Sequence, residues 1–389
     1  MNVDVAIVGA GPAGLCFARS LADSGLSVAV LEKQPTEQLA DPAFDGREIA
    51  LTHASRAILD RLGLWQCFDA EEVSELRDAR VIDGGAEAGL RVSAADGGRP
   101  QLGWLVPNHL IRKAAHALVA QQENVHLLGG RGVTSAARDA SGVSLAMEGG
   151  DTVRARLLVA ADSRFSQLRR MMGIGARSYD HGKRMLVCRV AIGRPHAHVA
   201  WEWFGYGQTL ALLPLNGDRA SVVLTLAPQD MAGIEAMDDA AFGAELERRF
   251  EGRLGTIRPT GTRHVYPLVS VFADRFTAPR VALVGDAAVG MHPVTAHGFN
   301  LGLQGQATLA EVVLEAHRSG EDIGSPEVLA RYGRHHQFAA WPMYAATRLV
   351  VRVFTDDRAP TRSIRAAILR LSNRLPPVRR AIAARLTQA

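Results

Sequence analysis

Near its N-terminus the chain reads Val5-Ala6-Ile7-Val8-Gly9-Ala10-Gly11-Pro12-Ala13-Gly14-Leu15. The β-branched run at residues 3–8 predicts a buried parallel strand, and apolar residues at helical spacing over 15–25 predict a helix. Each of the three glycines is needed for a different physical reason. Gly9 allows the tight turn, Gly11 lets the backbone approach a pyrophosphate, and Gly14 permits close packing of helix on strand. The free N–H groups at the start of the helix would face the phosphates.

A second strand is predicted at residues 27–31, and Glu32 and Lys33 follow it. An acid about twenty residues past the glycines accepts hydrogen bonds from adenosine ribose hydroxyls, and its charge repels a 2′-phosphate. This context predicts an adenine dinucleotide rather than an ordinary glycine turn. The motif alone does not separate FAD from NAD, but a single such motif favours a tightly held flavin. The predicted contacts come from Gly9, Gly11, Pro12, Ala13, Gly14, Glu32 and Lys33.

A second glycine-bearing segment, Gly285-Asp286-Ala287-Ala288, follows a buried strand predicted at residues 280–284. Asp286 can accept hydrogen bonds from ribityl hydroxyls. Gly298-Phe299-Asn300 then opens a helix predicted at about residues 301–317, whose N-terminal amides would stabilise negative charge on a reduced flavin ring. No Lys-Ser/Thr pair follows, as a P-loop requires. The two segments together predict FAD, because an extended dinucleotide needs one anchor for its pyrophosphate and another for its ribityl chain and ring.

Over essentially its whole length the chain resembles the class A flavoprotein monooxygenases, or aromatic hydroxylases. Within them it is most similar to the ubiquinone-biosynthesis hydroxylases of the UbiH, UbiF, UbiM and VisC type. Besides the two glycine segments and His292-Pro293, the landmarks are Gly46-Arg47-Glu48-Ile49-Ala50-Leu51-Thr52, Ala160-Ala161-Asp162-Ser163-Arg164-Phe165-Ser166, Phe354-Thr355-Asp356-Asp357-Arg358-Ala359-Pro360 and Arg374-Leu375-Pro376-Pro377-Val378-Arg379-Arg380.

The chain departs from the family pattern at three places. Ser163 stands where the family has glycine after Asp162, so this turn must be made without glycine. Val289 stands where a histidine is usual, and Ala296-His297-Gly298 replaces Gly-Gln-Gly. These departures bear on the choice of substrate and reductant and leave the flavin prediction unchanged.

The resemblance implies an FAD-dependent monooxygenase that uses O2 and a flavin C4a-hydroperoxide to hydroxylate the ring of a polyprenyl phenol or quinol. The cofactor carries the difficult chemistry, and the protein positions and desolvates it. The reductant, NAD(P)H or another electron donor, stays open. Same-fold alternatives are a hydroxylase of a small or polyketide aromatic and a flavin reductase of prenyl double bonds. A further alternative is a non-catalytic, flavin-containing scaffold of a biosynthetic complex.

The resemblance also implies roles for single residues on the cofactor side. Arg47 would contact the pyrophosphate, where a charge-assisted bond is natural. Asn108 would lie near the flavin, although it is nearly as well explained as the N-cap of a helix predicted at residues 110–121. Val133 would present its backbone to the adenine, and Asp162 would support the cofactor-side loop.

On the substrate side the resemblance places a backbone carbonyl of Pro293 over the reacting ring. His292 and His297 flank it, and either could help to move the proton of a phenol. Each histidine is also well explained as a hydrogen-bonded loop residue. No grouping of His, Cys and Asp has metal-ligand spacing, so we predict no metal.

The predicted fold class is α/β: a Rossmann-like FAD-binding domain of the aromatic-hydroxylase (GR2) type, an antiparallel substrate sheet, and a C-terminal helical segment. The FAD-binding domain is expected to be discontinuous, at residues 1–75, 100–175 and 275–345. The substrate domain is expected at residues 76–99 and 176–274, because 185–192, 198–204, 209–215 and 220–226 have the pattern of short strands. Trp201, Trp203 and Phe204 could line its pocket, with core packing expected for at least two of them.

Composition sets limits on the function. The chain has 389 residues, 47% of them apolar, and a formal net charge of +4, too weak to indicate nucleic-acid binding. Three cysteines without CxxC spacing indicate a reducing compartment. A strand so near the N-terminus leaves no room for a signal peptide, so we expect a cytoplasmic protein.

The predicted C-terminal helices at residues 346–389 are strongly basic. From Arg348 to the C-terminus the chain holds ten arginines and two acids, with an apolar stripe at helical spacing. One interpretation is a helix pair docked on the body with a solvated basic face. The other is a basic amphipathic contact with an anionic membrane surface, at its inner face, or with partner proteins of quinone biosynthesis.

Overall fold

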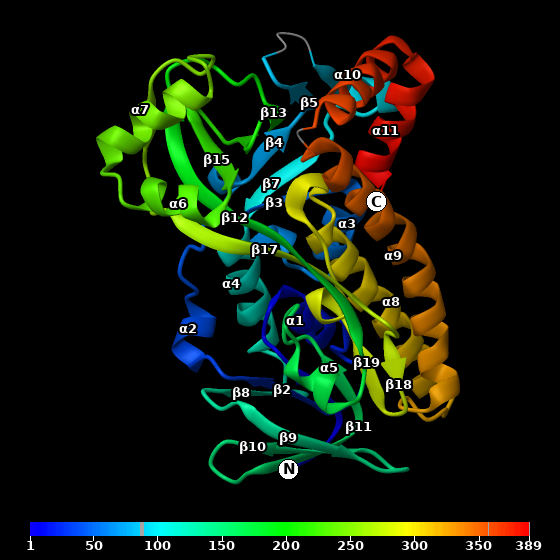
Figure 1. The fold of residues 1–389 in the computed structure, drawn as a ribbon. Coiled ribbons are helices and arrows are strands. Elements are labelled where there is room, and N and C mark those ends of the chain that lie inside the picture. The colour runs from blue at the N-terminus through cyan, green and yellow to red at the C-terminus, as the bar shows by residue number, and fades with distance from the viewer. Residues whose placement is uncertain (86–88, 357, 389) are drawn as a thin grey trace.

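The computed structural model describes residues 1–85, 89–356 and 358–388. An eight-stranded sheet carries the N-terminal motif (Figure 1). Its parallel strands lie in the order β19 (Val281–Leu283), β11 (Thr152–Ala160), β1 (Asn2–Val8), β2 (Val28–Glu32) and β8 (Val125–Gly129). The antiparallel strands are β18 (Thr277–Ala278) at one edge, and β10 (Val143–Met147) and β9 (Val133–Arg138) beyond β11. Strands predicted at residues 3–8, 27–31 and 280–284 are confirmed, with bounds shifted by a residue or two.

Helices pack around this sheet. The first, α1 (Pro12–Ser20), contacts α4 (Asn108–Val119) and α8 (Gly298–Arg318), and α8 contacts α9 (Pro326–Phe354). Further helices of this layer are α2 (Thr36–Ala40), α3 (His53–Arg61) and α5 (Gln167–Met171). The three helices predicted from periodicity are confirmed, and each begins two or three residues earlier than expected. The residues before the predicted starts all lie in first turns, where helical periodicity has not yet begun: Pro12, Ala13 and Gly14 in α1, Asn108 and His109 in α4, and Gly298, Phe299 and Asn300 in α8.

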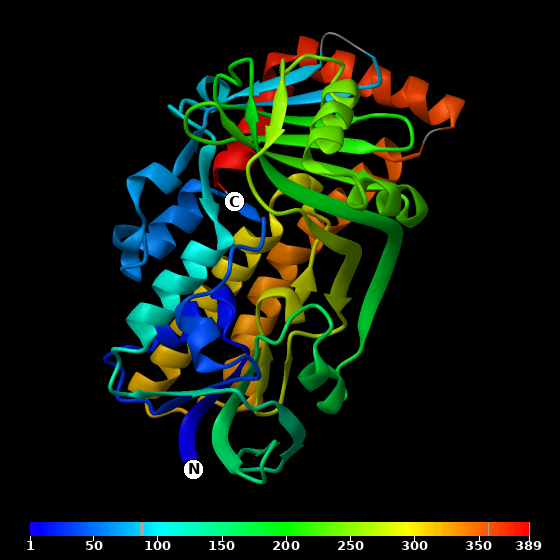
Figure 2. The same cartoon turned by 90° about the vertical axis from the view of Figure 1, so that its left-hand side faces the viewer.

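A nine-stranded sheet forms the second layer. Its strands lie in the order β20 (Val289–Gly290), β17 (His264–Ala273), β12 (Ala176–Ile192), β15 (Arg219–Leu226), β14 (Thr209–Pro214), β13 (Val199–Phe204), β5 (Asp78–Asp83) and β6 (Leu90–Ser93), with β16 (Ile257–Pro259) paired to β12. Except for the parallel pair β13–β5, the neighbours are antiparallel. Figure 2 shows this sheet above the first layer, with the long strand β12 running down between them. The outer face packs on α6 (Pro228–Glu235) and α7 (Asp239–Arg249).

Smaller elements join the two layers. A three-stranded sheet has the order β3 (Glu48–Leu51), β7 (Gly103–Pro107), β4 (Ser74–Leu76). Single 3-10 turns are η1 (Trp65–Cys67), η2 (Ala70–Glu72), η3 (Ala94–Gly97), η4 (Gly285–Ala287) and η5 (Pro293–Thr295). The last two hold the second glycine-bearing segment against the start of α8.

The C-terminal helices lie against the edge of the nine-stranded sheet. These are α10 (Ala359–Arg374) and α11 (Pro376–Gln388), which contact β6 and η3 (Figure 1). Their apolar cluster joins Leu90, Val92 and Phe204 of the sheet to Phe354 and Leu369. No helix within the described residues is long and apolar enough to cross a membrane.

The predicted fold class is confirmed: an α/β layer with a Rossmann-like motif, a largely antiparallel sheet and a helical C-terminus. The division into domains stays a prediction. Its boundary at residue 175 coincides with the start of β12, whereas the boundary at 345 falls inside α9. The apolar pattern continues through α9. The rise in arginine content near residue 348 therefore marks a change in surface charge and not the end of a helix.

Candidate active site

A cavity of about 2200 Å³ lies between the carboxyl ends of the parallel strands and the inner face of the nine-stranded sheet. Every predicted site residue lines it except Gly14. Gly14 has instead a packing role, because a Cβ there would come within 2.1 Å of the Gly9 carbonyl oxygen. Gly9 has φ +109°, and its own Cβ would meet the Ala161 carbonyl oxygen at 2.4 Å. A Cβ on Gly11 meets nothing within 4 Å, so the loop is open on that side.

Glu32 lies at the end of β2 beside this loop. Its carboxylate accepts hydrogen bonds from the backbone N–H of Ala10 at 2.8 Å and of Gln34 at 3.1 Å. The acid thus fixes the glycine loop, and each oxygen keeps a further lone pair for a hydroxyl group. Lys33 and Val133 line the same end of the cavity.

Asp45 organises the next part of the wall. Its Oδ2 accepts hydrogen bonds from Arg47 Nη2 at 2.6 Å and from Asn108 Nδ2 at 2.7 Å. Burial opposes ionisation of this carboxyl, but these donors hold the pKa of Asp45 below its usual value. Asn108 is the first residue of α4 and makes no side-chain cap, so the predicted N-cap role is wrong. Both predicted residues are instead held together by an acid that sequence reasoning missed.

Asp286 is held by an arginine from a distant segment. Arg164 donates to Asp286 Oδ2 from Nε at 3.0 Å and from Nη2 at 2.7 Å, and from Nη1 to the Val269 carbonyl at 3.0 Å. The other oxygen, Oδ1, accepts no hydrogen bond from the described residues, and Asp286 lines the cavity. Asp162 accepts from the Ser166 hydroxyl and from Leu168 N, which fixes the loop that carries Arg164.

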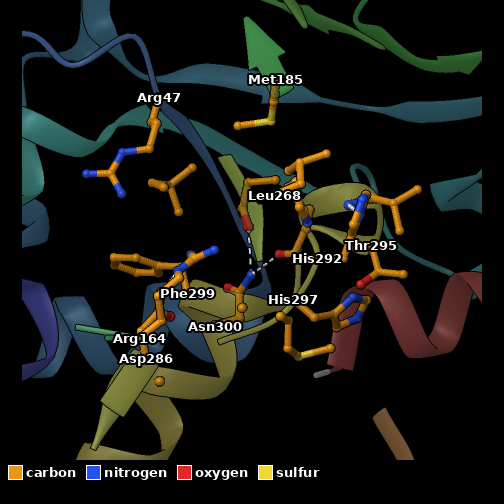
Figure 3. A pocket seen from close by; sticks show the side chains of 18 of the residues that line it. Arg47, Arg164, Met185, Leu268, Asp286, His292, Thr295, His297, Phe299 and Asn300 are labelled. Atoms are coloured by element: carbon orange, nitrogen blue, oxygen red, sulfur yellow. Dashed lines mark hydrogen bonds and ion pairs between the residues drawn. The ribbon is translucent and has the colours of Figure 1, made fainter. Parts of the chain in front are cut away.

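The start of α8 forms the floor of the cavity (Figure 3). Asn300 is 1% exposed and uses its whole amide: Nδ2 donates to the carbonyls of Ala50 and Ala296, both at 2.8 Å, and Oδ1 accepts from Thr52 N at 3.0 Å. Its side chain therefore joins β3 to the turn before α8. No side chain caps the helix, so the amides of its first turn, at Gly298 and Phe299, remain for a ligand.

The turn at His292 and Pro293 borders the sheet side. His292 Nδ1 accepts from Val294 N at 3.2 Å, and its ring meets His181 edge-on with centroids 4.6 Å apart. Burial, with the neighbouring His181 and Arg164, lowers the pKa of His292 to about 3. This imidazole is thus neutral at physiological pH. His297 is 6% exposed and precedes α8 at the opposite end of the same turn.

At each of the three departures from the family pattern, the neighbouring backbone or side chains accommodate the residue that is present. Ser163 takes φ +91°, a conformation that favours glycine. Val289 is buried in β20, where it pairs with Phe272. Ala296 makes the turn before α8 with φ +53° and accepts the Asn300 hydrogen bond.

The inner face of the nine-stranded sheet forms the remaining wall. Ala200, Glu202 and Phe204 of β13 line the cavity, whereas Trp203 packs in the outer core and donates Nε1–H to the Gly84 carbonyl at 2.7 Å. Trp201 packs against the same outer core and also lines the cavity. Of the three predicted aromatic residues, Trp201 and Phe204 thus line the cavity and Trp203 does not.

Comparisons with known proteins support a cofactor site of this kind. A family model described as FAD binding domain matches residues 2–347. The chain belongs to that FAD-binding family. It is 41% identical to the ubiquinone hydroxylase UbiM of Neisseria meningitidis, over 100% of this chain and 85% of that protein. It is 30% identical to the 3-demethoxyubiquinol 3-hydroxylase of Escherichia coli, over 93% and 92% of the two chains.

Solved structures share the fold. The p-nitrophenol 4-monooxygenase PnpA of Pseudomonas putida matches with a TM-score of 0.81 and 20% identity, over 99% of this chain and 98% of that chain. The anhydrotetracycline hydroxylase OxyS of Streptomyces rimosus matches with a TM-score of 0.75 and 23% identity, over 100% and 76%. From family and relatives together, the protein is an FAD-dependent monooxygenase, and FAD is its cofactor, as predicted.

The residues present fit FAD. The loop is open at Gly11, Asp286 keeps one oxygen available, and the amides at the start of α8 are uncapped. Sequence reasoning missed Asp45, Arg164 and Glu202. Glu202 left one signal, an acid that alternates with tryptophans in the strand-like run at residues 199–204.

Proposed function

We propose that this monooxygenase hydroxylates a ring carbon of a prenylated phenol or quinol in ubiquinone biosynthesis. The observation that carries the proposal is an apolar cavity that continues from the flavin-binding residues to the C-terminal helices. Its far end is lined by Leu90, Val92, Phe204, Leu369 and Leu386. A small aromatic substrate leaves this end empty, whereas a prenyl chain fills it with apolar contacts. Two relatives, at 41% and 30% identity, carry names of ubiquinone-pathway hydroxylases.

We propose the predicted contacts for FAD. Gly9, Gly11, Pro12, Ala13 and the start of α1 would hold the pyrophosphate, with Arg47 beside it. Glu32, Lys33 and Val133 would hold the adenosine end.

Asp286 Oδ1 would accept from the ribityl chain, and the amides of Gly298 and Phe299 would meet the flavin ring. Gly14, Asn108, Asp162 and Asn300 then have positioning roles. When bound, FAD supplies the activation of O2.

The chain's own part in the reaction is to hold the aromatic ring in a dry site. Pro293 and the neutral imidazole of His292 border the space between the start of α8 and the sheet. Because Nδ1 accepts from Val294 N, the neutral imidazole carries its proton on Nε2, which can donate a hydrogen bond to a phenol or quinol oxygen and so orient the ring. His297 lies at the other end of this turn and would shape the same wall.

We further propose that the C-terminal helices bring the cavity mouth to an anionic membrane surface. The exposed apolar side chains here are Leu349 in α9, Ile364 and Leu371 in α10, and Leu375 just after α10, at 62%, 54%, 60% and 41%, and arginines are interspersed among them. An exposed apolar stripe among basic residues suits an interfacial helix. The same surface also suits a partner protein of quinone biosynthesis. Peripheral binding would let a prenylated substrate enter from the bilayer.

Quinone profiling of a strain that lacks the gene tests the proposed function. We expect loss of ubiquinone and accumulation of a prenylated intermediate that lacks one hydroxyl group, restored by the wild-type gene. A variant with Asp286→Ala should fail to restore it. An unchanged quinone profile in a strain without another such hydroxylase would overturn the proposal.

A further inference from the structure

The inner face of the nine-stranded sheet carries one row of aligned side chains across the cavity. The register pairs Glu202 of β13 with Ala211 of β14 on one side and with Val81 of β5 on the other. The row continues through Val223 and Val187 at one end and Leu90 at the other. All six residues line the cavity, and five of them are apolar. A carboxyl group therefore stands in the middle of an otherwise apolar wall.

Glu202 is not used by the protein itself. It is partly exposed, although the exposure is to the cavity, and no described residue gives its carboxyl a hydrogen bond or an ion pair. Burial raises the pKa of Glu202 to about 8, so the group is a neutral acid at pH 7. A buried polar group without a partner destabilises the folded protein. Such a group is readily explained when its partner is a ligand that enters the cavity.

In one direction this row of side chains leads to the part of the cavity beside His292. Met185 is two residues before Val187 on the same face of β12, and Figure 3 shows its side chain directed into the pocket on the side of Leu268 and His292. Farther along β12, His181 contacts His292. In the other direction, Leu90 packs with Phe354 and Leu369. Glu202 thus lies between the part of the cavity beside the flavin-binding residues and the apolar part at the C-terminal helices.

We infer that Glu202 hydrogen-bonds a ring oxygen of the substrate, a phenolic hydroxyl or quinol hydroxyl, and so selects the ring carbon that faces the flavin. The inference rests on the proposed function. A protonated carboxyl both donates and accepts, so one hydroxyl can be held at two points. With the prenyl chain directed to the C-terminal helices and one oxygen fixed at β13, the ring has a single orientation.

A binding cycle tests the inference without turnover. The probes are 2-geranylphenol and its methyl ether, 2-geranylanisole, titrated onto the FAD-loaded protein and followed by the flavin absorbance. We expect the wild type to prefer the phenol by about 10-fold or more, the effect of one good hydrogen bond. Glu202→Leu should bind the two probes equally, and Glu202→Gln should keep part of the preference. The exposed Glu235→Gln on α6 is the matched control and should behave like the wild type.

The outcomes separate the inference from the proposed function. A phenol preference that persists in Glu202→Leu overturns the role of Glu202, because a steric cause would survive a substitution of similar size. If the wild type hydroxylates a prenylated phenol to one product, Glu202→Leu should give a mixture of ring positions. A wild type that hydroxylates no prenylated phenol overturns the proposed function, while the binding cycle still reports on Glu202. Thermal unfolding completes the set: Glu202→Leu should unfold at an equal or higher temperature, since an unpaired carboxyl is removed.

Discussion

Arg164 and Asp286 join two segments that are far apart in the sequence, with Nε and Nη2 of the arginine 3.0 and 2.7 Å from one oxygen of the aspartate. Both side chains are about one-third exposed, at 28% and 35%. The ion pair therefore contributes little to stability by itself, because solvent screens it. Its consequence is orientation: the arginine holds one oxygen of Asp286 and leaves the other without a hydrogen-bond partner among the described residues, in a side chain that lines the cavity.

The first prediction follows from this pair. Asp286→Ala removes the acceptor and should weaken FAD binding by about 10-fold or more, the effect of hydrogen bonds to a charged group. Arg164→Ala leaves the acceptor but frees its orientation, so we expect a loss of about 3-fold to 10-fold. Flavin fluorescence titration of the apoprotein measures both. Arg170→Ala, an exposed arginine on α5, is the control, and equal losses in all three variants would contradict the orientation role.

Substitutions of two glycines in the same loop should have different effects, one on stability and the other on FAD binding. Gly14→Ala puts a Cβ within 2.1 Å of the Gly9 carbonyl, so we expect the free energy of unfolding to fall by about 1–3 kcal/mol. Gly11→Arg projects into open space, so the fold should persist while FAD is lost. Urea unfolding and the visible absorbance of the purified protein distinguish the two. A yellow Gly11→Arg protein would show that this side of the loop does not face the cofactor.

Ser163 offers a stabilising change. Its φ of +91° is unfavourable for any side chain, and glycine, the family's residue, adopts it without strain. Ser163→Gly should therefore raise the free energy of unfolding by about 1 kcal/mol. Ser163→Ala keeps the unfavourable Cβ and should give no gain. Thermal unfolding of the three proteins checks the order, and a gain from alanine equal to that from glycine would point to the hydroxyl instead.

The pH dependence of stability reports on Glu202. The unfolded chain loses this proton near the ordinary pKa of 4.5, whereas the folded protein keeps it up to about pH 8. Between these values the unfolded state binds fewer protons, so this group makes the free energy of unfolding fall as pH rises. Between pH 5 and 8 the free energy of unfolding of the wild type should fall by on the order of 2 kcal/mol relative to that of Glu202→Gln, a figure that allows for water in the cavity. Urea unfolding of the apoproteins measures it, and a pH-independent difference would place the carboxyl in water.

The basic C-terminal helices make a membrane prediction. The protein should sediment with vesicles that contain anionic lipid at low salt and much less with neutral vesicles. Replacing the exposed Leu371 and Leu375 with serine should weaken binding at constant charge. Absence of sedimentation by the intact wild type at low salt would leave a protein partner as the role of this surface.

The local sequence predicts elements whose parts follow one another in the chain, but not the contacts between distant segments. The glycine loop, Glu32 and the start of α8 were predicted because strand, turn and helix follow one another within a few residues. The partners Asp45 and Arg164 were missed, since their contacts depend on how separate segments fold together. Glu202 was missed for a related reason: which face of β13 meets the cavity is set by its register with β14 and β5, and a shift of one residue would reverse it.

The central claim is that the FAD-loaded protein inserts one atom of O2 into the ring of a prenylated phenol. The direct measurement uses purified protein, a chemical reductant for the flavin, 2-geranylphenol and ¹⁸O2, with mass spectrometry of the product. We predict a hydroxylated product that carries one ¹⁸O atom, and no such product from Asp286→Ala. Reoxidation of the reduced flavin that yields only hydrogen peroxide, with 2-geranylphenol and longer prenyl homologues all unchanged, would contradict the account.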